Sequence, residues 1–399
     1  MIKPYIMKNK VVILFASVLF SLHLHSADIY VNSSGQPGTY TTISAALVAA
    51  NSSDKIYISP FATYNENLSI DKSVTLVSSE DSTDYYVNGN ITIFTIGALD
   101  IRLIGGECNN INFTTASATE SNRCKVSIVG TVFGNNLSAP KGVDLNLFYC
   151  DIPSQSVTFY FGKIIANDVS NLTIPEGDNS YYSDTTYIIA NTIGSSALSV
   201  SNGDHNFFVA NNLFQGTSGA NMYVYKATVS GGGGNTIVNN TFTQTSYTTY
   251  GSNLKIVHNQ NMTNTQVKNN TFQNGYNSSN SAYRKHIGST SSSNTLNTTN
   301  GPVVTFNHFH NIYGGVYNYT VLPNNVLGGA IPQNEGDPSI QYYDIDLTRN
   351  NMGRFGGPYT WDNYHGNSTS GKGRVYLLDM PFEFWPGQTP TINADAVHE

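Results

Sequence analysis

A short motif of apolar and polar positions recurs along this chain. Each copy has one or two aliphatic residues, a pair of asparagines and then an aromatic residue. The clearest copies span 209–214, 237–242 and 267–272, with a variant at 304–309 and weaker forms at 126–133, 164–169 and 188–193. Because the motif returns every ~20 to 40 residues, it predicts one supersecondary unit stacked on copies of itself.

Each copy of the motif predicts a short strand followed by a sharp turn. Apolar and polar residues alternate in it, and almost no helical periodicity competes. Leucine-rich repeats would need regular leucines, and propeller blades would need four strands in about 40 to 45 residues. The pattern therefore predicts an all-β fold, a right-handed single-stranded parallel β-helix solenoid.

The asparagine pairs have a structural explanation. Asparagine tolerates the left-handed backbone region of a sharp turn, and stacked side-chain amides hydrogen-bond to one another. We expect Asn212, Asn240 and Asn270 to form a ladder between coils, not a catalytic set. The alternative is that the pairs are ordinary loop residues of an Asn-rich protein.

The first 26 residues resemble a cleavable secretory signal peptide. Lys3, Lys8 and Lys10 precede an apolar run over 11–22, and small residues follow at 26 and 27. The run has 12 residues, whereas a membrane-spanning helix needs about 20, and no later segment is long and apolar enough to span. We expect a secreted or cell-surface protein.

The N-terminal part of the mature chain resembles the cap of pectin-lyase-like right-handed β-helix proteins. A strand over 28–32 precedes a short Ala-rich amphipathic helix within 38–50, and the first coils follow over 55–77. The resemblance implies that the helix covers the open end of the solenoid. We assign 27–335 to the β-helix domain.

The remaining residues, 336–399, are expected to form a capping segment and a small β-rich extension. Residues 337–359 resemble the closing segment of exported β-helix proteins of Bacteroidota. Asp344, Asp346 and Arg349 are interpreted as hydrogen-bonding groups and an ion pair of this segment. Calcium binding by the two carboxylates is the alternative, because calcium prefers oxygen ligands.

The net charge narrows the classes of binding partner. Without the three signal lysines, 16 basic side chains stand against 26 acidic ones, a net charge of −10. Nucleic-acid binding is disfavoured, since the chain offers no basic stripe.

Cys150 is expected to be a small buried residue. Cys108 and Cys124 leave two alternatives open, a disulfide or two thiols.

Catalytic constellations are sparse. The acidic residues are scattered over the array, and Asp151 and Asp168 alone fall at loosely equivalent positions of successive repeats. The cluster Arg284, Lys285 and His286 lies in a polar insertion, where a base for lyase chemistry on a uronate is one interpretation and a solvated loop the other. Asp204 and His205 are an alternative acid–base pair, but they are adjacent, so in a strand they would point to opposite faces. No metal, cofactor or phosphate-binding motif is present.

The sequence is compatible with two functions. The first is an exported β-helix that binds or presents a surface to a polysaccharide or cell-surface glycan without catalysis. The second is a polysaccharide lyase or glycoside hydrolase with a divergent site. Asparagine and tyrosine on one solenoid face suit both functions, because sugars bind amides and aromatic planes. The fold alone does not decide between them.

Overall fold

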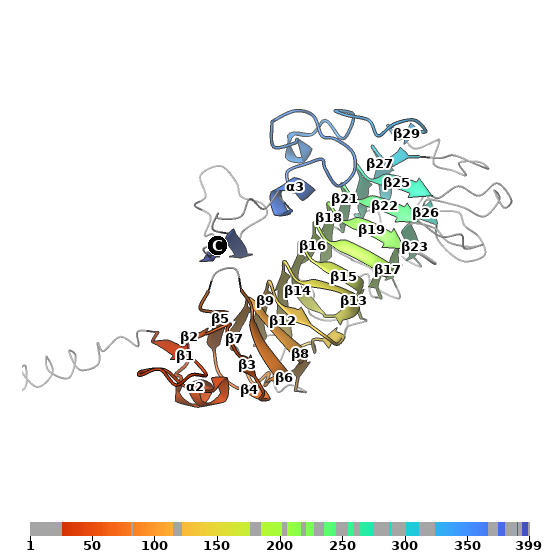
Figure 1. The fold of residues 1–399 in the computed structure, drawn as a ribbon. Helices are drawn as coiled ribbons and strands as arrows, with labels where there is room; N and C mark the ends of the chain where they lie inside the picture. Colours follow the sequence, from red (N-terminus) through yellow and green to blue (C-terminus); the bar gives the residue numbers. More distant parts are fainter. Residues whose placement is uncertain are drawn as a thin grey trace, which may run out of the picture.

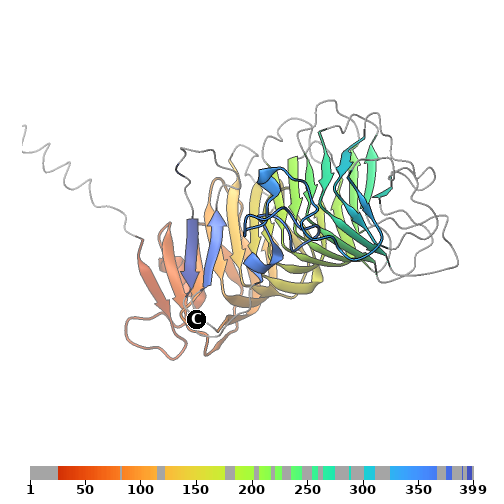
Figure 2. The same cartoon turned by 90° about the horizontal axis from the view of Figure 1, so that it is seen from above.

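The computed structural model shows an elongated stack of coils that runs from the N-terminal strands to β29, with the C-terminal segment along its side (Figures 1 and 2). The structure describes residues 26–80, 83–114, 122–175, 185–201, 206–216, 221–226, 235–244, 254–258, 264–274, 287–288, 301–310, 324–365, 374–379, 389 and 393–397. The signal-like residues 1–25 lie outside this set. None of the described helices is long and apolar enough to cross a membrane.

One wall of the solenoid is sheet A, in which twelve described strands pair in parallel. In sheet order they are β1 (Asp28–Val31), β2 (Asp54–Ile58), β5 (Val74–Ser78), β7 (Asp100–Ile104), β9 (Cys124–Val129), β12 (Val143–Phe148), β14 (Phe161–Ile165), β16 (Thr185–Ile189), β18 (Asn206–Ala210), β21 (Thr236–Val238), β24 (Gln266–Lys268) and β27 (Val303–Thr305).

The second wall consists of sheets B and C, also parallel. Sheet B contains β3 (Thr63–Tyr64), β4 (Leu68–Ile70), β6 (Tyr85–Ile93), β8 (Gly106–Phe113) and β10 (Val132–Phe133). Sheet C contains β11 (Leu137–Ser138), β13 (Asp151–Thr158), β15 (Asp168–Ile174), β17 (Thr192–Val200), β19 (Leu213–Gly216), β20 (Met222–Lys226), β22 (Thr241–Gln244), β23 (Leu254–His258), β25 (Thr271–Asn274), β26 (Ile287–Gly288), β28 (His308–Phe309) and β29 (Val326–Leu327). The predicted all-β parallel solenoid is confirmed.

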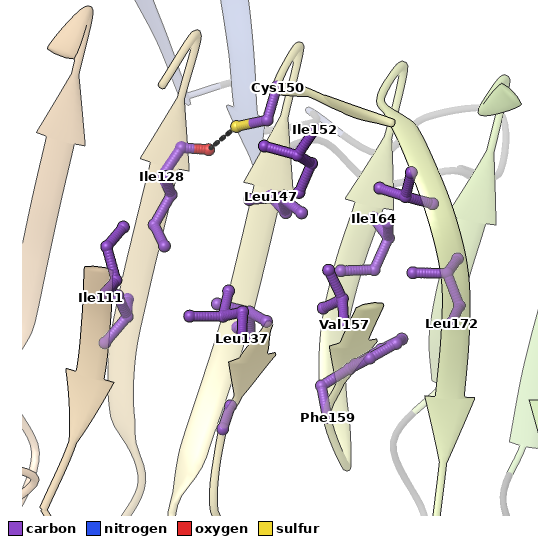
Figure 3. Close-up of a cluster of buried hydrophobic side chains, with 14 of the residues drawn as sticks. Ile111, Ile128, Leu137, Leu147, Cys150, Ile152, Val157, Phe159, Ile164 and Leu172 are labelled. Carbon is purple, nitrogen blue, oxygen red and sulfur yellow. Dashed lines mark hydrogen bonds between the residues drawn. The ribbon is translucent and has the colours of Figure 1, made fainter. Parts of the chain in front are cut away.

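The core between the walls is built from columns of like residues. One column, fully buried, follows sheet A through Ile56, Leu76, Leu103, Ile128, Leu147, Ile164, Ile188, Val209, Ile237 and Val267. Figure 3 shows part of this interior. On sheet C, Phe214, Phe242, Phe272 and Phe309 stack with ring centroids 4.6, 4.8 and 5.1 Å apart. The aromatic residue of these four motif copies therefore lies inside the solenoid.

The two asparagines of each pair have different structural roles. The first adopts the left-handed conformation, with φ of 56° at Asn211, 55° at Asn239 and 56° at Asn269. The second points into the turn and forms the predicted ladder. Its members are Asn167, Asn191, Asn212, Asn240, Asn270, Asn307 and Asn325, and each backbone N–H donates to the side-chain oxygen of the next at 2.8–3.0 Å.

The predicted N-terminal helix is confirmed as α2 (Ile43–Ala49), with Thr42 as its N-cap. The Thr42 hydroxyl accepts a hydrogen bond from the Ala45 N–H at 3.2 Å, which satisfies one of the free donors of the first turn. Ile43, Ala46 and Leu47 are buried against the first coils, so the helix covers this end of the core.

The segment over 335–365, here called the strap, lies along the turn between sheets A and C. It contains the 3-10 helix η2 (Ile340–Tyr342) and α3 (Trp361–Tyr364). Its Asp337 N–H donates to Asn269 Oδ1 at 2.8 Å, while Asn239 Nδ2 donates to the Asn351 carbonyl at 2.9 Å. Asn211 Nδ2 donates to the Arg354 carbonyl at 2.9 Å. The first asparagine of three successive pairs therefore binds the strap.

Part of the outer face of sheet A is apolar and covered, although Lys55, Arg102 and Lys163 also lie on this face. Its buried residues include Val129, Phe148, Ile165, Ile189 and Ala210, and strap aromatics pack against this cluster: Tyr342, Tyr359, Trp361 and Tyr364. The antiparallel pair β30 (Arg374–Asp379) and β31 (Asn393–Val397) lies beside the same wall (Figures 1 and 2). The strap therefore closes this apolar part of sheet A to a ligand.

The three cysteines are buried free thiols. Of the two alternatives for Cys108 and Cys124, the structure therefore shows thiols rather than a disulfide. Cys108 lies on β8 in sheet B and Cys124 begins β9 in sheet A. Cys150 is buried as predicted, although it lies at the turn after β12 and not within a strand.

Candidate functional site

The outer face of the second wall carries a row of uncharged hydroxyl and amide side chains. Parallel pairing places Ser138, Thr158, Thr173, Ser199 and Tyr223 directly beside one another on successive coils. Ser138 is exposed and the others are half-buried. On sheet B the equivalent row is Ser69, Thr92 and Asn112. We call these residues the hydroxyl row.

An amide row runs beside it, two residues earlier along the strands. On sheet B, Asn90 N–H donates to Asn67 Oδ1 at 2.9 Å, and Asn110 Nδ2 donates to Asn90 Oδ1 at 2.6 Å. On sheet C, Ser156 N–H donates to Asn136 Oδ1 at 2.9 Å, and Asn171 Nδ2 hydrogen-bonds to Ser156 Oγ. Residues two apart on a strand face the same side, about 7 Å from each other.

A third line of exposed amides borders the amide row on sheet B. Asn88 Nδ2 donates to Asn65 Oδ1 at 2.7 Å, and Asn109 Nδ2 donates to Asn88 Oδ1 at 3.3 Å. An amide has two donors and an acceptor oxygen with two lone pairs, so one bond along the row leaves further capacity. The rows therefore present aligned donors and acceptors at the strand spacing of about 4.8 Å.

Local irregularities of the strands align these residues. The pairing register shifts between Val87 and Asn90 on β6, between Ile152 and Ser156 on β13, and between Val169 and Asn171 on β15. A bulge re-aims the side chains that follow it. The shifts come directly before Asn90, Ser156 and Asn171, three members of the amide row, and so help to set the direction of these side chains.

One acidic pair lies on sheet C, before the register shifts of β13 and β15. Asp151 and Asp168 are register partners on β13 and β15, so the sequence-based correspondence of their positions is confirmed. Burial, and secondarily the neighbouring Asp151 charge, raises the pKa of Asp168 above its ordinary value. The pair stands at the start of the strands, three residues before the amide row on β15.

The other sequence candidates fall outside this wall or outside the described residues. Arg284, Lys285 and His286 lie in the latter group, as do Asp204 and His205. Among the residues that the structure describes, no group of three or more His, Cys, Asp or Glu side chains is placed to hold a metal ion.

Asp344, Asp346 and Arg349 organise the strap. Asp344 accepts hydrogen bonds from the Asn351 amide and from the Gly357 N–H, and Asp346 accepts from the Thr348 N–H and hydroxyl. Arg349 donates to the backbone carbonyls of Gly336 at 2.7 Å and Glu335 at 3.2 Å. The expected hydrogen bonds are present, whereas among the described residues Arg349 forms these carbonyl contacts and not the expected ion pair.

The repeated sequence motif does not predict the polar rows. Asn67, Asn90 and Asn110 are separated by 23 and 20 residues, and none belongs to the repeated motif. A signal does exist, because each is followed two residues later by Ser69, Thr92 or Asn112, a polar residue on the same face of a strand.

No family model matches the sequence, and no curated protein or solved structure shows significant similarity to it.

Proposed function

We propose that this protein is an exported, non-catalytic β-helix that binds a neutral polysaccharide along its second wall. The observation that carries the proposal is the pair of parallel rows, hydroxyl and amide, that continues over successive coils. A repeating ligand matches a repeating surface, and a glycan is a repeating ligand whose hydroxyls both donate and accept hydrogen bonds.

The charge distribution supports a neutral ligand. The members of both rows up to Tyr223 are uncharged, and Lys255 is the next register partner on β23. Glu66, Asp71 and Glu107 lie on or next to the same face. A polyanion such as a uronate chain or a nucleic acid would meet this negative charge without a basic stripe to offset it.

Export is proposed on the sequence features already described. The signal-like residues 1–26, the cap resembling pectin-lyase-like proteins and the strap resembling the closing segment of exported Bacteroidota proteins all support it. A cell-surface or secreted location would bring the rows into contact with extracellular glycans.

Affinity measurements on a paired variant test the proposal. Ser138→Ala combined with Thr158→Ala removes two neighbouring hydroxyls, each worth about 0.5–1.5 kcal/mol, so binding should weaken by about 5-fold to 150-fold. Ser33→Ala combined with Ser52→Ala, at exposed loop positions outside the rows, is the control and should bind as the parent does. Isothermal calorimetry against cello-, manno- and xylo-oligosaccharides provides the readout, and equal affinity in both variants would contradict the proposal.

A second candidate function, cleavage of the glycan, is favoured by the Asp151 and Asp168 pair. Two neighbouring carboxylates are required for the acid and base roles in glycoside hydrolysis, and burial raises the pKa of Asp168. Incubation with neutral and uronate-containing polysaccharides, with and without calcium, tests it through reducing ends and unsaturated products. Product that disappears in Asp168→Asn would favour catalysis, whereas silence across the panel would favour binding alone.

A further inference from the structure

A hollow of about 410 Å³ lies at the N-terminal end of the second wall. The helix α2 forms one side of it and the outer face of β4 forms the other, with Figure 1 showing the two elements next to each other. Its lining residues are Ser44, Leu47, Val48, Asn67, Ser69, Asp71 and Lys72. The volume falls within the range of small-molecule sites, about 300–1,000 Å³.

Both polar rows end in this hollow. Asn67 is the first member of the amide row, since its Oδ1 accepts from the Asn90 N–H at 2.9 Å. Ser69 is the first member of the hydroxyl row and the register partner of Thr92. A linear ligand that follows the rows towards the N-terminus therefore meets α2, which closes the path at the first coil.

The wall formed by α2 is fixed at both ends by the segment that carries β4. Glu66 accepts hydrogen bonds from the N–H groups of Ile43 at 2.8 Å and Ser44 at 2.9 Å. Lys72 Nζ donates to the carbonyls of Leu47 at 3.1 Å and Ala50 at 3.0 Å. A carboxylate at the helix N-terminus and an ammonium at its C-terminus both interact favourably with the helix dipole. The hollow is therefore preformed.

The lining suits one sugar unit. The Asp71 carboxylate is exposed and accepts hydrogen bonds only, which matches two neighbouring hydroxyls of a pyranose. The hydroxyls of Ser44 and Ser69 add mixed donors and acceptors, and Val48, 83% exposed, offers an apolar surface for the face of the ring. The Lys72 ammonium already donates hydrogen bonds to two carbonyls, so the carboxylate of an acidic sugar would lie near Asp71 and be repelled by it.

We propose that the hollow binds the terminal sugar of a neutral glycan chain whose following units lie on the two rows. The protein then recognises chain ends and not only chain surfaces. This inference rests on the proposed function, because the rows supply the rest of the contact.

Calorimetry with neutral oligosaccharides of increasing length tests the inference. Cello-, manno- and xylo-oligosaccharides from the disaccharide to the hexasaccharide are used, in free form and with each end blocked in turn, by reduction to the alditol or by O-methylation of the non-reducing unit. Asp71→Ala should weaken binding of free oligosaccharides by at least ten-fold. Asp28→Ala, an exposed aspartate on sheet A, should leave binding unchanged. Blocking one end should weaken binding to the parent protein by a similar factor and have no further effect on Asp71→Ala.

The outcomes separate the two proposals. If Asp71→Ala binds as the parent does, or if neither of the two end blocks weakens binding, end recognition is wrong. Row binding still stands in that case if Ser138→Ala with Thr158→Ala is impaired. If no neutral oligosaccharide of any series binds, both proposals fail. Binding of free monosaccharide as tight as that of the hexasaccharide would show a monosaccharide site and overturn the assignment to a chain end. Circular dichroism confirms that each variant keeps its β-structure.

Discussion

Cys150 and Asn167 are neighbours in one buried ladder: the Cys150 N–H donates to Asn167 Oδ1 at 2.9 Å. The thiol points at the carbonyl of Ile128 at 3.7 Å (Figure 3) and at that of Phe148 at 3.4 Å. Asn167 Nδ2 donates to the equivalent carbonyls one coil further on, those of Ile165 and Leu147. A cysteine thus holds a position that asparagine holds in seven later coils.

This relationship predicts that Cys150→Asn stabilises the protein. An amide is a stronger donor than a thiol, so the free energy of unfolding should rise by about 0.5–1.5 kcal/mol. Cys150→Val, which fills similar space without a donor, should lower it by about 1 kcal/mol or more because both carbonyls lose their partner. Urea unfolding followed by circular dichroism measures the difference, and a valine variant as stable as the asparagine variant would refute the ladder role.

Asn240→Ala is expected to be far more damaging than removal of an exposed amide. Asn240 is fully buried and donates to the carbonyls of Val209 and Val238 and to Asn270 Oδ1 at 2.9–3.0 Å. Each buried partner left without a hydrogen bond costs about 1–3 kcal/mol, so the loss should reach at least about 3 kcal/mol. Asn88→Ala, in the exposed row, should cost less than about 1 kcal/mol because water replaces the amide. The shift in urea midpoint distinguishes the two.

Docking of the strap should weaken in acid through Asp337. Burial disfavours its charge, but hydrogen bonds from Lys268 at 2.9 Å and from Ser339 outweigh burial, so the pKa of Asp337 lies below its ordinary value. A lowered folded-state pKa contributes stability that is present above the unfolded pKa, about 3.9, and is lost as the pH falls through the lower folded value. Proteolysis of the strap should therefore accelerate below about pH 3.9.

Asp337→Asn provides the control for this pH dependence. The variant should show faster proteolysis of the strap near neutral pH, because Lys268 loses its charged partner in a largely buried site. It should also lose the acid-dependent step. An acid step that persists unchanged in Asp337→Asn would assign the effect to another group.

The three thiols should be inert in the folded protein. Burial raises the pKa of Cys108 and of Cys150 to about 12, and that of Cys124 to about 11. Since the thiolate is the reactive form, Ellman's reagent at pH 8 should detect almost no thiol before unfolding and three per chain in guanidinium. Fewer than three after unfolding, recovered only with a reductant, would indicate a disulfide.

The features that could be predicted from sequence are those that the motif repeats. Phe214, Phe242 and Phe272 recur at one place after each asparagine pair, so like residues had to stack when the coils stacked. The N-terminal helix was predictable for a different reason, since its Ala-rich face stands alone in a chain of strands. Both features are encoded locally, within a few residues of each other.

The features that could not be predicted depend on distant residues or on substitutions within the pattern. Cys150 carries no asparagine to mark it as a ladder member. The contact of Asn211 with the strap joins residues 143 positions apart, and no local pattern encodes it. The polar rows depend on bulges whose positions follow from the pairing of neighbouring coils, so their alignment becomes visible only in three dimensions.

The strap also changes how the array can come apart. In a solenoid each coil contacts only its neighbours, so the stack can unravel from an end, one coil at a time. Here one continuous segment bonds to Asn269, Asn239 and Asn211 and reaches the Ala190 carbonyl through His365 at 2.7 Å. Unravelling of these coils from the C-terminal end therefore also has to break the strap's hydrogen bonds, which couples coils that would otherwise contact only their neighbours.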